Sequence, residues 1–183
     1  MKYVRVWLQL TNCAFSSYAS NRIDSLSYFI GKLIRFGFFF LFIISIFSYN
    51  DTLAGYSKFE VLLFFLTFNI VDVLGQTFMR GVYLFRRYIR EGGFDYVLHK
   101  PINPLFYVLS RLTDLLDMLF LIPLFGVLVW VISHLPITLS PLAVFLYILL
   151  ILCGLLIITS FHIIAAGITV THVESTNIIW FYR

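Results

Sequence analysis

Two carboxylates and an arginine follow one another three residues apart late in the chain, at Arg111, Asp114 and Asp117. Paired carboxylates can hold a hard cation or act as a general acid and base. Neither a histidine nor a third carboxylate lies at ligand spacing beside this pair, which argues against both kinds of chemistry. On a helix the three residues share one face. The sequence therefore predicts that they form interfacial ion pairs with the arginine-rich segment that precedes them.

A polar stripe is predicted on the helix that precedes the arginine-rich segment. Its members are spaced so that they share one helical face: Asn69, Asp72, Gln76 and Arg80. A carboxylate inside a membrane helix is costly and usually faces a partner or a wet cavity. One interpretation is that Asn69, Asp72 and Gln76 line a translocation path or a dimer seam. The alternative is that Asp72 lies near the cytoplasmic interface and pairs with a nearby arginine.

The rest of the sequence contains no pattern that predicts a metal site or a nucleotide-binding site. The histidines are scattered, at His99, His134, His162 and His172, and the two cysteines form neither a disulfide framework nor a metal site. The chain contains neither a phosphate-binding G-x-x-x-x-G-K-[ST] loop nor a G-x-S-x-G nucleophile motif. We expect no enzymatic activity, metal or cofactor on this chain. If ATP and Mg²⁺ are used, another chain binds them and hydrolyses the nucleotide.

The composition is that of a helical integral membrane protein. Hydrophobic residues make up 61% of the chain and charged residues 12%, with a mean hydropathy of +0.94, and the apolar runs are long enough to cross a bilayer. Their lack of residue-by-residue alternation argues against a transmembrane barrel. The net charge of +4 is explained by membrane topology, so we do not expect nucleic-acid binding.

The apolar runs predict an all-α membrane protein with a single transmembrane domain over residues 1–183. An amphipathic helix within residues 1–25 is expected to lie along the lipid headgroups, with Trp7 and Ala14 on its apolar face. Lys32 and Arg35 are expected to snorkel from the first span to the membrane surface. Four membrane spans are predicted, at residues 28–47, 59–78, 115–132 and 141–165.

The positive charges indicate the orientation of these spans. All but one of the thirteen lysines and arginines fall on one side of the predicted membrane, leaving only Lys58 on the other. Cytoplasmic loops are enriched in these residues. The N-terminus and the segment 80–104 are therefore predicted to lie in the cytoplasm.

Within segment 80–104, which is predicted to be cytoplasmic, residues 91–104 are the most polar and turn-rich stretch of the chain. Gly92 and Gly93 should end one helix, after which Phe94, Val97 and Leu98 form the apolar face of a short second helix. Asn103-Pro104 is a good start for a third helix, which is expected to continue into the span at 115–132. The short helix could enter a groove on a soluble domain or simply lie on acidic lipid, and its residues favour neither interpretation.

The run from Gly93 to Phe106 resembles a family motif. From Asp95 to Phe106 it matches the pattern D-x-x-L-x-[KR]-P-[ILV]-N-P-x-[FY]. We associate this motif with ABC-2 type transporter permeases, the small membrane subunits of bacterial ATP-driven exporters. Similar residues in that family match Ser110-Arg111, Asp114 and Val173-Glu174-Ser175. The resemblance covers most of the chain from about residue 20.

The resemblance implies six spans, an N-terminal interfacial helix, and a dimeric core, of two identical or two sister permeases, working with two ABC ATPase subunits in the bacterial inner membrane. This chain supplies about four spans, and Asn177 to Arg183 begin another apolar stretch, so we expect a C-terminally truncated subunit. The resemblance assigns ATPase coupling to one set of residues: Phe94, Asp95, Val97, Leu98, Lys100, Pro101, Asn103 and Pro104.

Two other functions remain open from the sequence. One is a polytopic membrane enzyme acting on lipid-linked substrates, which would depend on Asp114 and Asp117. The other is a non-catalytic membrane scaffold. The substrate is not encoded in any motif that we recognise, and export rests on analogy with the family.

Overall fold

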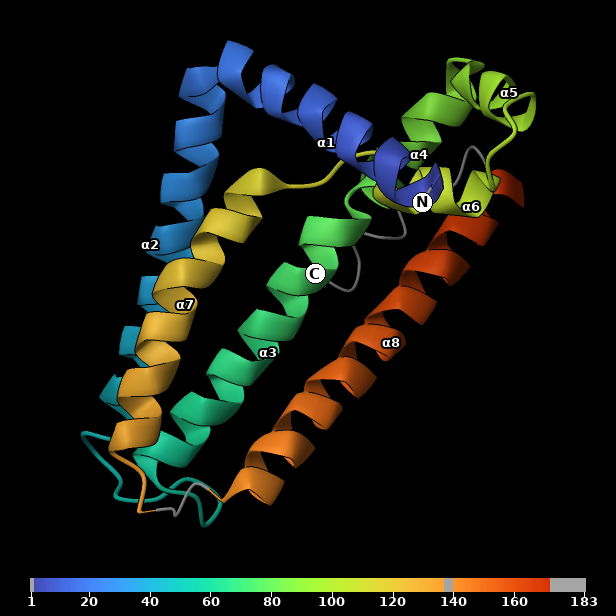
Figure 1. Ribbon diagram of the computed structural model, residues 1–183. Coiled ribbons are helices and arrows are strands. Elements are labelled where there is room, and N and C mark those ends of the chain that lie inside the picture. Colours follow the sequence, from blue (N-terminus) through green and yellow to red (C-terminus); the bar gives the residue numbers. More distant parts are fainter. Residues whose placement is uncertain (1, 137–139, 172–183) are drawn as a thin grey trace. The chain divides into compact units, whose positions relative to one another are not determined.

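The computed structural model describes residues 2–136 and 140–171, and within them it is helical, with an isolated bridge between Leu53 and Tyr56 as the sole extended pairing (Figure 1). Four of its helices are long and apolar enough to cross a membrane. This confirms the predicted all-α membrane fold. The described helices are α1 (Lys2–Ser20), α2 (Arg22–Ile46), α3 (Lys58–Met79), α4 (Gly81–Arg90), α5 (Gly93–Leu98), α6 (Pro104–Ser110), α7 (Leu115–Ser133) and α8 (Pro141–Thr171).

The start of α3 is marked by a cap from the Glu60 side chain. The Glu60 carboxylate accepts hydrogen bonds from the Ser57 backbone N–H at 2.7 Å and from its hydroxyl at 2.8 Å. Glu60 thereby reaches back to a backbone N–H group just before the first helical turn, which is one half of a capping box. The cap therefore marks where the turn after α2 ends and the second apolar helix begins.

The helix predicted to run from Asn103-Pro104 into the third span is interrupted. Helix α6 ends at Ser110 and α7 begins at Leu115. In the interruption, the Asp114 backbone N–H donates to the Thr77 carbonyl oxygen of α3 at 3.0 Å. This amide therefore bonds across to another helix instead of continuing its own, which corrects the prediction of one continuous helix.

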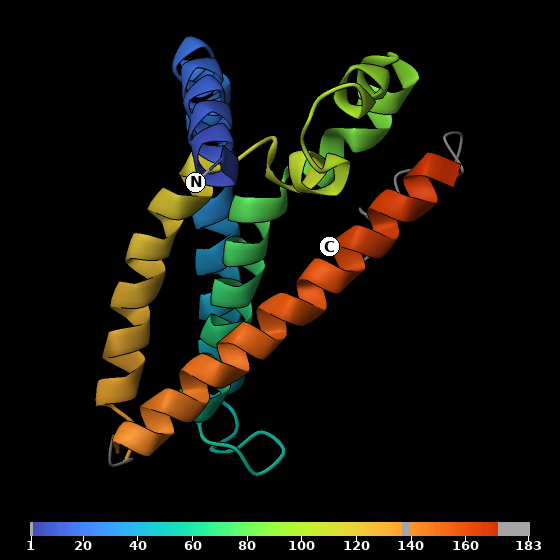
Figure 2. The same cartoon turned by 45° about the vertical axis from the view of Figure 1, so that its right-hand side comes forward.

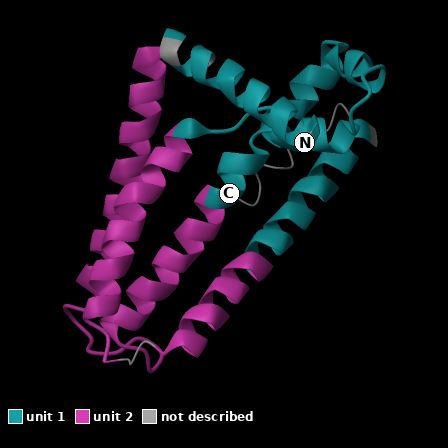
Figure 3. Ribbon diagram, viewed as in Figure 1, with its two compact units in different colours: residues 1–20, 74–115, 154–183 teal, residues 21–73, 116–153 magenta. Residues whose placement is uncertain are grey.

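The chain divides into two compact units, coloured separately in Figure 3. Unit 1 comprises residues 1–20, 74–115 and 154–183, and unit 2 comprises residues 21–73 and 116–153. Several of the long helices contribute residues to both.

Aromatic side chains connect the helices of unit 2, beside a buried aliphatic core that includes Leu62, Leu66 and Leu124. The Phe36 ring of α2 stacks on Phe65 of α3, with centroids 5.6 Å apart, and meets Phe120 of α7 edge-on at 5.7 Å. The Thr67 and Tyr147 hydroxyls, from α3 and α8, are hydrogen-bonded at 2.8 Å. Aromatic pairs of this geometry add to the dispersion energy that packs membrane helices.

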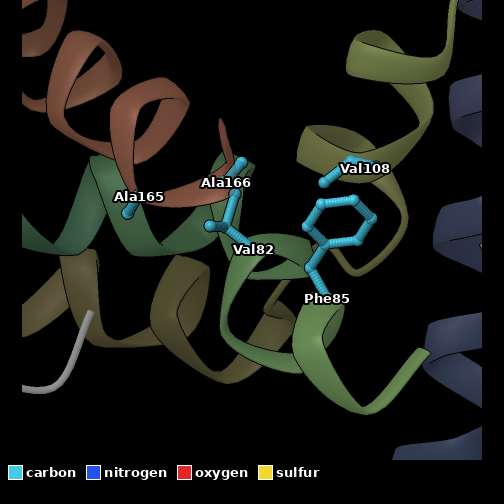
Figure 4. Close-up of a cluster of buried hydrophobic side chains, with 5 residues drawn as sticks. All are labelled: Val82, Phe85, Val108, Ala165 and Ala166. Carbon is cyan, nitrogen blue, oxygen red and sulfur yellow. The ribbon is translucent and has the colours of Figure 1, made fainter. Parts of the chain in front are cut away.

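Unit 1 contains the short helices. Figures 1 and 2 both show α4, α5 and α6 grouped closely. A buried apolar cluster is formed by side chains of α4, α6 and α8 (Figure 4). Its members are Val82 and Phe85 of α4, Val108 of α6, and Ala165 and Ala166 of α8. The small alanines allow α8 to approach α4 closely.

A glycine permits a still closer contact at the start of α4. A Cβ atom at Gly81 would lie 2.0 Å from the Val108 carbonyl oxygen of α6. Real Cβ atoms do not approach backbone so closely, so α4 and α6 can pack in this way only because residue 81 has no side chain.

Helix α1 is fastened to other segments of unit 1. The Lys2 ammonium donates to the Pro101 carbonyl oxygen, and the Thr11 hydroxyl donates to that of Thr113 at 3.1 Å. The Trp7 ring lies 6.3 Å from that of Phe78, and Ala14 is buried. The predicted apolar face therefore packs within unit 1, while its placement along lipid headgroups stays a prediction.

Candidate functional site

The segment between α4 and α6 makes a sharp turn before the short helix α5. Gly92 has a φ of +72°, which favours glycine, and ends the preceding helix as predicted. The next residue is also constrained, because a Cβ atom at Gly93 would lie 2.2 Å from Cε2 of Tyr88. The two glycines thus let α5 fold back directly against α4.

Helix α5 presents a different face from the one that the sequence predicted. We expected Phe94, Val97 and Leu98 to form one exposed apolar surface. Instead Val97 is fully buried, and the Phe94 ring meets Phe85 of α4 edge-on with centroids 5.1 Å apart. The exposed large side chains are Tyr96, at 74%, and Leu98, at 56%. Burying Phe94 and Val97 is what attaches so short a helix to α4 and α6.

The residues after α5 make the local structure that their types predict. Asn103 caps α6, its side-chain oxygen accepting hydrogen bonds from the backbone N–H groups of Leu105 at 2.9 Å and Phe106 at 3.2 Å. Pro104 occupies the first turn, where its missing N–H group costs nothing. Asp95 and Lys100 are exposed, and Pro101 anchors Lys2 through its carbonyl oxygen. The eight predicted coupling residues therefore lie along one continuous stretch of unit 1.

The predicted interfacial cluster of Arg111, Asp114 and Asp117 is divided by the structure. Asp114 pairs with Arg80 in unit 1, whereas Asp117 pairs with Lys32 in unit 2. Both carboxylates are fully buried instead of lying at an exposed interface. Arg111 lies over the Tyr88 ring, 3.6 Å from its centroid. The break between α6 and α7 separates residues that a continuous helix would have aligned.

Lys32 also departs from its prediction. Its side chain is only 5% exposed and meets Asp117, so it does not reach the surface by snorkelling. Burial of this charge is compensated by the carboxylate. A lysine within an apolar run signals such a partner, but helical spacing could not identify a residue 85 positions away.

The predicted polar stripe lies on α3, and its members differ in burial. Gln76 is buried, at 2% exposure, while Asn69 and Asp72 are half-buried. The Asn69 amide donates to the Phe65 carbonyl oxygen at 2.8 Å. A role for these residues in a translocation path or dimer seam stays a prediction.

The described residues contain no group of three His, Cys, Asp or Glu side chains placed to hold a metal. His162 is buried, with Nδ1 at 2.8 Å from the Ile158 carbonyl oxygen and its ring edge-on to Tyr83. His172, the Val173-Glu174-Ser175 match and Asn177 to Arg183 lie outside the described residues.

A family model described as "ABC-2 family transporter protein" matches residues 33–183 of the chain. The chain belongs to this ABC-2 family. Searches of curated proteins and of solved structures gave no match. ABC-2 membership, together with four helices suited to crossing a membrane, identifies a multi-pass transporter membrane subunit, a permease.

Proposed function

We propose that this ABC-2 permease couples ATP hydrolysis by a separate ABC ATPase subunit to export across the bacterial inner membrane. In this proposal the N-terminus and segment 80–104 face the cytoplasm, and ATP and Mg²⁺ are bound by the ATPase. Helix α5 is the surface that the ATPase contacts.

The geometry of α5 carries this proposal. Val97 is fully buried between exposed Tyr96 and Leu98, so the helix is held firmly while keeping large apolar groups available. Such a helix suits the apolar groove of a soluble partner. Because the packing of Val97 holds the backbone of α5, the Tyr96 side chain can bind a partner with little further loss of backbone freedom.

The attachment of α5 supports a mechanical role. Phe94 packs on Phe85 of α4, and Phe85 belongs to the cluster that includes Ala165 and Ala166 of α8. A displacement of α5 by its partner would therefore be passed to the cytoplasmic end of a long membrane helix. Alternating access would follow if two permease subunits respond together, identical or sister, with Asn69, Asp72 and Gln76 along the path or seam.

Paired tyrosine substitutions test this proposal. Tyr96→Ala is compared with Tyr49→Ala, because Tyr49 is also exposed, at 87%, but lies in the turn predicted to face outside. Both variants are co-expressed with the ATPase that copurifies with the wild-type protein in mild detergent. We expect Tyr96→Ala to lower permease-stimulated ATP hydrolysis by about tenfold or more, the usual effect of losing an aromatic hot spot, while Tyr49→Ala leaves it unchanged.

Orientation is checked separately. Cysteine introduced at position 98 should react with a membrane-impermeant maleimide only after the cells are opened, and cysteine at position 49 should react in intact cells. Equal effects of the two alanine variants on ATP hydrolysis would contradict the coupling role of α5. Labelling of position 98 in intact cells would contradict the topology itself.

A further inference from the structure

Two tyrosines and two cations converge in unit 1 beside α5. The Arg111 guanidinium carbon lies 3.6 Å from the centroid of the Tyr88 ring, and the Lys100 ammonium lies 5.5 Å from the centroid of the Tyr107 ring. The two rings are stacked with centroids 6.5 Å apart and an interplanar angle of 29°. The four side chains come from α4, α6 and the two segments that flank α6, so the tertiary fold assembles the cluster.

No carboxylate in the described part of the chain neutralises the charges in this cluster. The described residues form ion pairs at Lys32, Arg80 and Arg87, but no described carboxylate pairs with Arg111 or Lys100. Arg111 is nevertheless half-buried. Two neighbouring cations without a counter-charge repel each other, so the arrangement gains stability when an anion joins it.

The geometry of Arg111 suits a particular anion. A guanidinium that rests on an aromatic ring at this distance keeps its donor N–H groups directed away from the ring, within its own plane. Those donors form a fork that matches the oxygens of a phosphate group. Lys100 adds a point charge, and Arg111, Lys100 and Tyr107 all interact electrostatically with the Tyr88 side chain.

We propose that Tyr88, Lys100, Tyr107 and Arg111 form a binding site for a phosphate group, as carried by an anionic lipid headgroup or by free phosphate. Arg111 binds two phosphate oxygens, Lys100 supplies a second positive charge, and the tyrosine hydroxyls donate hydrogen bonds. Helix α7 begins at Leu115, shortly after Arg111, which places the site near a span terminus, where basic pockets bind lipid headgroups.

The site is also connected to the coupling helix. Tyr88, which carries Arg111 on its ring, is the side chain that a Cβ atom at Gly93 would strike at 2.2 Å. Phosphate bound to Arg111 would therefore hold the ring on which the first residue of α5 rests. The binding site and α5 share one contact without sharing a residue.

Binding to the full-length protein in a neutral detergent tests the proposal. Dioctanoyl phosphatidic acid, dioctanoyl phosphatidylcholine and inorganic phosphate are titrated separately, with lipid counted by native mass spectrometry and phosphate by equilibrium dialysis. We expect saturable binding of one phosphatidic acid or one phosphate per chain. No ATPase is present, so the result is independent of the proposed coupling function.

Four variants define the site. Arg111→Gln should weaken binding by about ten- to hundredfold, as expected for the loss of charge-assisted hydrogen bonds. Arg111→Lys keeps the charge but loses the fork, and Tyr107→Phe keeps the ring but loses the hydroxyl, so each should weaken binding by about three- to tenfold. Arg90→Gln is the matched control, because Arg90 is an exposed cation at the end of α4, and it should change affinity less than about twofold.

The outcomes distinguish a lipid headgroup site from a site for free phosphate, and both from the absence of a specific site. Arg111-dependent binding of phosphatidic acid alone supports a headgroup site, and equally strong binding of inorganic phosphate supports a site for the free ion. Equal weakening by Arg90→Gln and Arg111→Gln would overturn the proposal, since it indicates diffuse attraction. If Arg111→Gln does not fold, unchanged affinity in both Arg111→Lys and Tyr107→Phe would overturn it.

Discussion

Among the described residues, each compact unit contains an ion pair with a fully buried carboxylate, and these two pairs differ in the exposure of the cation. In unit 2 the Lys32 side chain is 5% exposed beside Asp117, whereas in unit 1 the Arg80 side chain is 29% exposed beside Asp114. The same chemistry therefore has two consequences. Lys32 depends on Asp117 for compensation of its charge, while Arg80 is also stabilised by water.

The surroundings of the two cations reinforce this difference. The Lys32 ammonium lies 5.6 Å from the Tyr28 ring centroid and 5.7 Å from that of Phe120, within the aromatic packing of unit 2. Arg80 precedes α4, where the chain leaves the apolar helix α3. A buried ion pair costs most when one partner is removed and the other remains, so the two units should respond unequally to the same substitution.

The largest effect is expected from Asp117→Asn. It leaves the Lys32 charge buried and should lower the free energy of unfolding by about 3–5 kcal/mol. Thermal unfolding in detergent measures the loss, with Asp51→Asn, at an exposed turn residue, as the control. The double variant Lys32→Met/Asp117→Leu should recover most of the stability. A double variant as unstable as Asp117→Asn would show that the charge is not the cause.

Gly81→Ala tests the backbone packing that unit 1 needs and unit 2 does not. The added methyl group would meet the Val108 carbonyl oxygen at 2.0 Å, and the required shift should cost about 1–3 kcal/mol. Gly37→Ala in α2 is the control, because a Cβ atom there meets nothing within 4 Å. It should instead stabilise its helix by about 0.5–1 kcal/mol. Equal unfolding temperatures for the two variants would contradict the close approach of α4 and α6.

A smaller loss is expected from Asp114→Asn. Because nearly a third of the Arg80 side chain is exposed (29%), water can replace part of the lost interaction, and we expect a destabilisation of about 1–2 kcal/mol. The measurement is the same unfolding experiment, run beside Asp117→Asn. If Asp114→Asn were the more damaging of the two, cation exposure would not be what distinguishes the pairs.

Tyr96→Ala should have the smallest effect on stability. Tyr96 is 74% exposed, so the unfolding free energy should change by less than about 0.5 kcal/mol. Val97→Ala, at the buried neighbour, should cost about 1–3 kcal/mol. Comparing the two by thermal unfolding shows which face of α5 supports the fold, and a loss with Tyr96→Ala as large as with Val97→Ala would refute the assignment.

Some helix boundaries were predictable because local residues specify them. The apolar run predicted a span at 59–78, and α3 occupies Lys58–Met79. Gly92 and Asn103 likewise have the turn and cap conformations that their residue types favour. These features depend on neighbours in sequence, and so a sequence alone contains them. Other boundaries differ, because α2 begins at Arg22, before the span predicted at 28–47, and α8 continues to Thr171, past the span predicted at 141–165.

Side-chain partners were less predictable because they depend on tertiary contacts. Spacing placed Asp114 and Asp117 in one cluster, but their cations come from different helices, and the break before Leu115 was not visible in the apolar pattern. In α5 apolar residues surround the helix, so its inward face depends on α4 and α6. The contacts of Tyr88 with Arg111 and of Tyr107 with Lys100 were missed because cation–aromatic contacts of this kind have no fixed spacing in the sequence.

Helix α8 has 31 residues and is therefore about 46 Å long, while the hydrocarbon layer of a bilayer is about 30 Å thick. A helix of that length must tilt or extend beyond the acyl chains, and the angle depends on how long those chains are. Ala165 and Ala166, in its second half, lie in one buried cluster with Val82 and Phe85 of α4. Because α8 packs against α4, the length of the acyl chains would affect the position of the helices that support α5. A host membrane of different thickness would therefore change the conformation of the transporter without any change in its sequence.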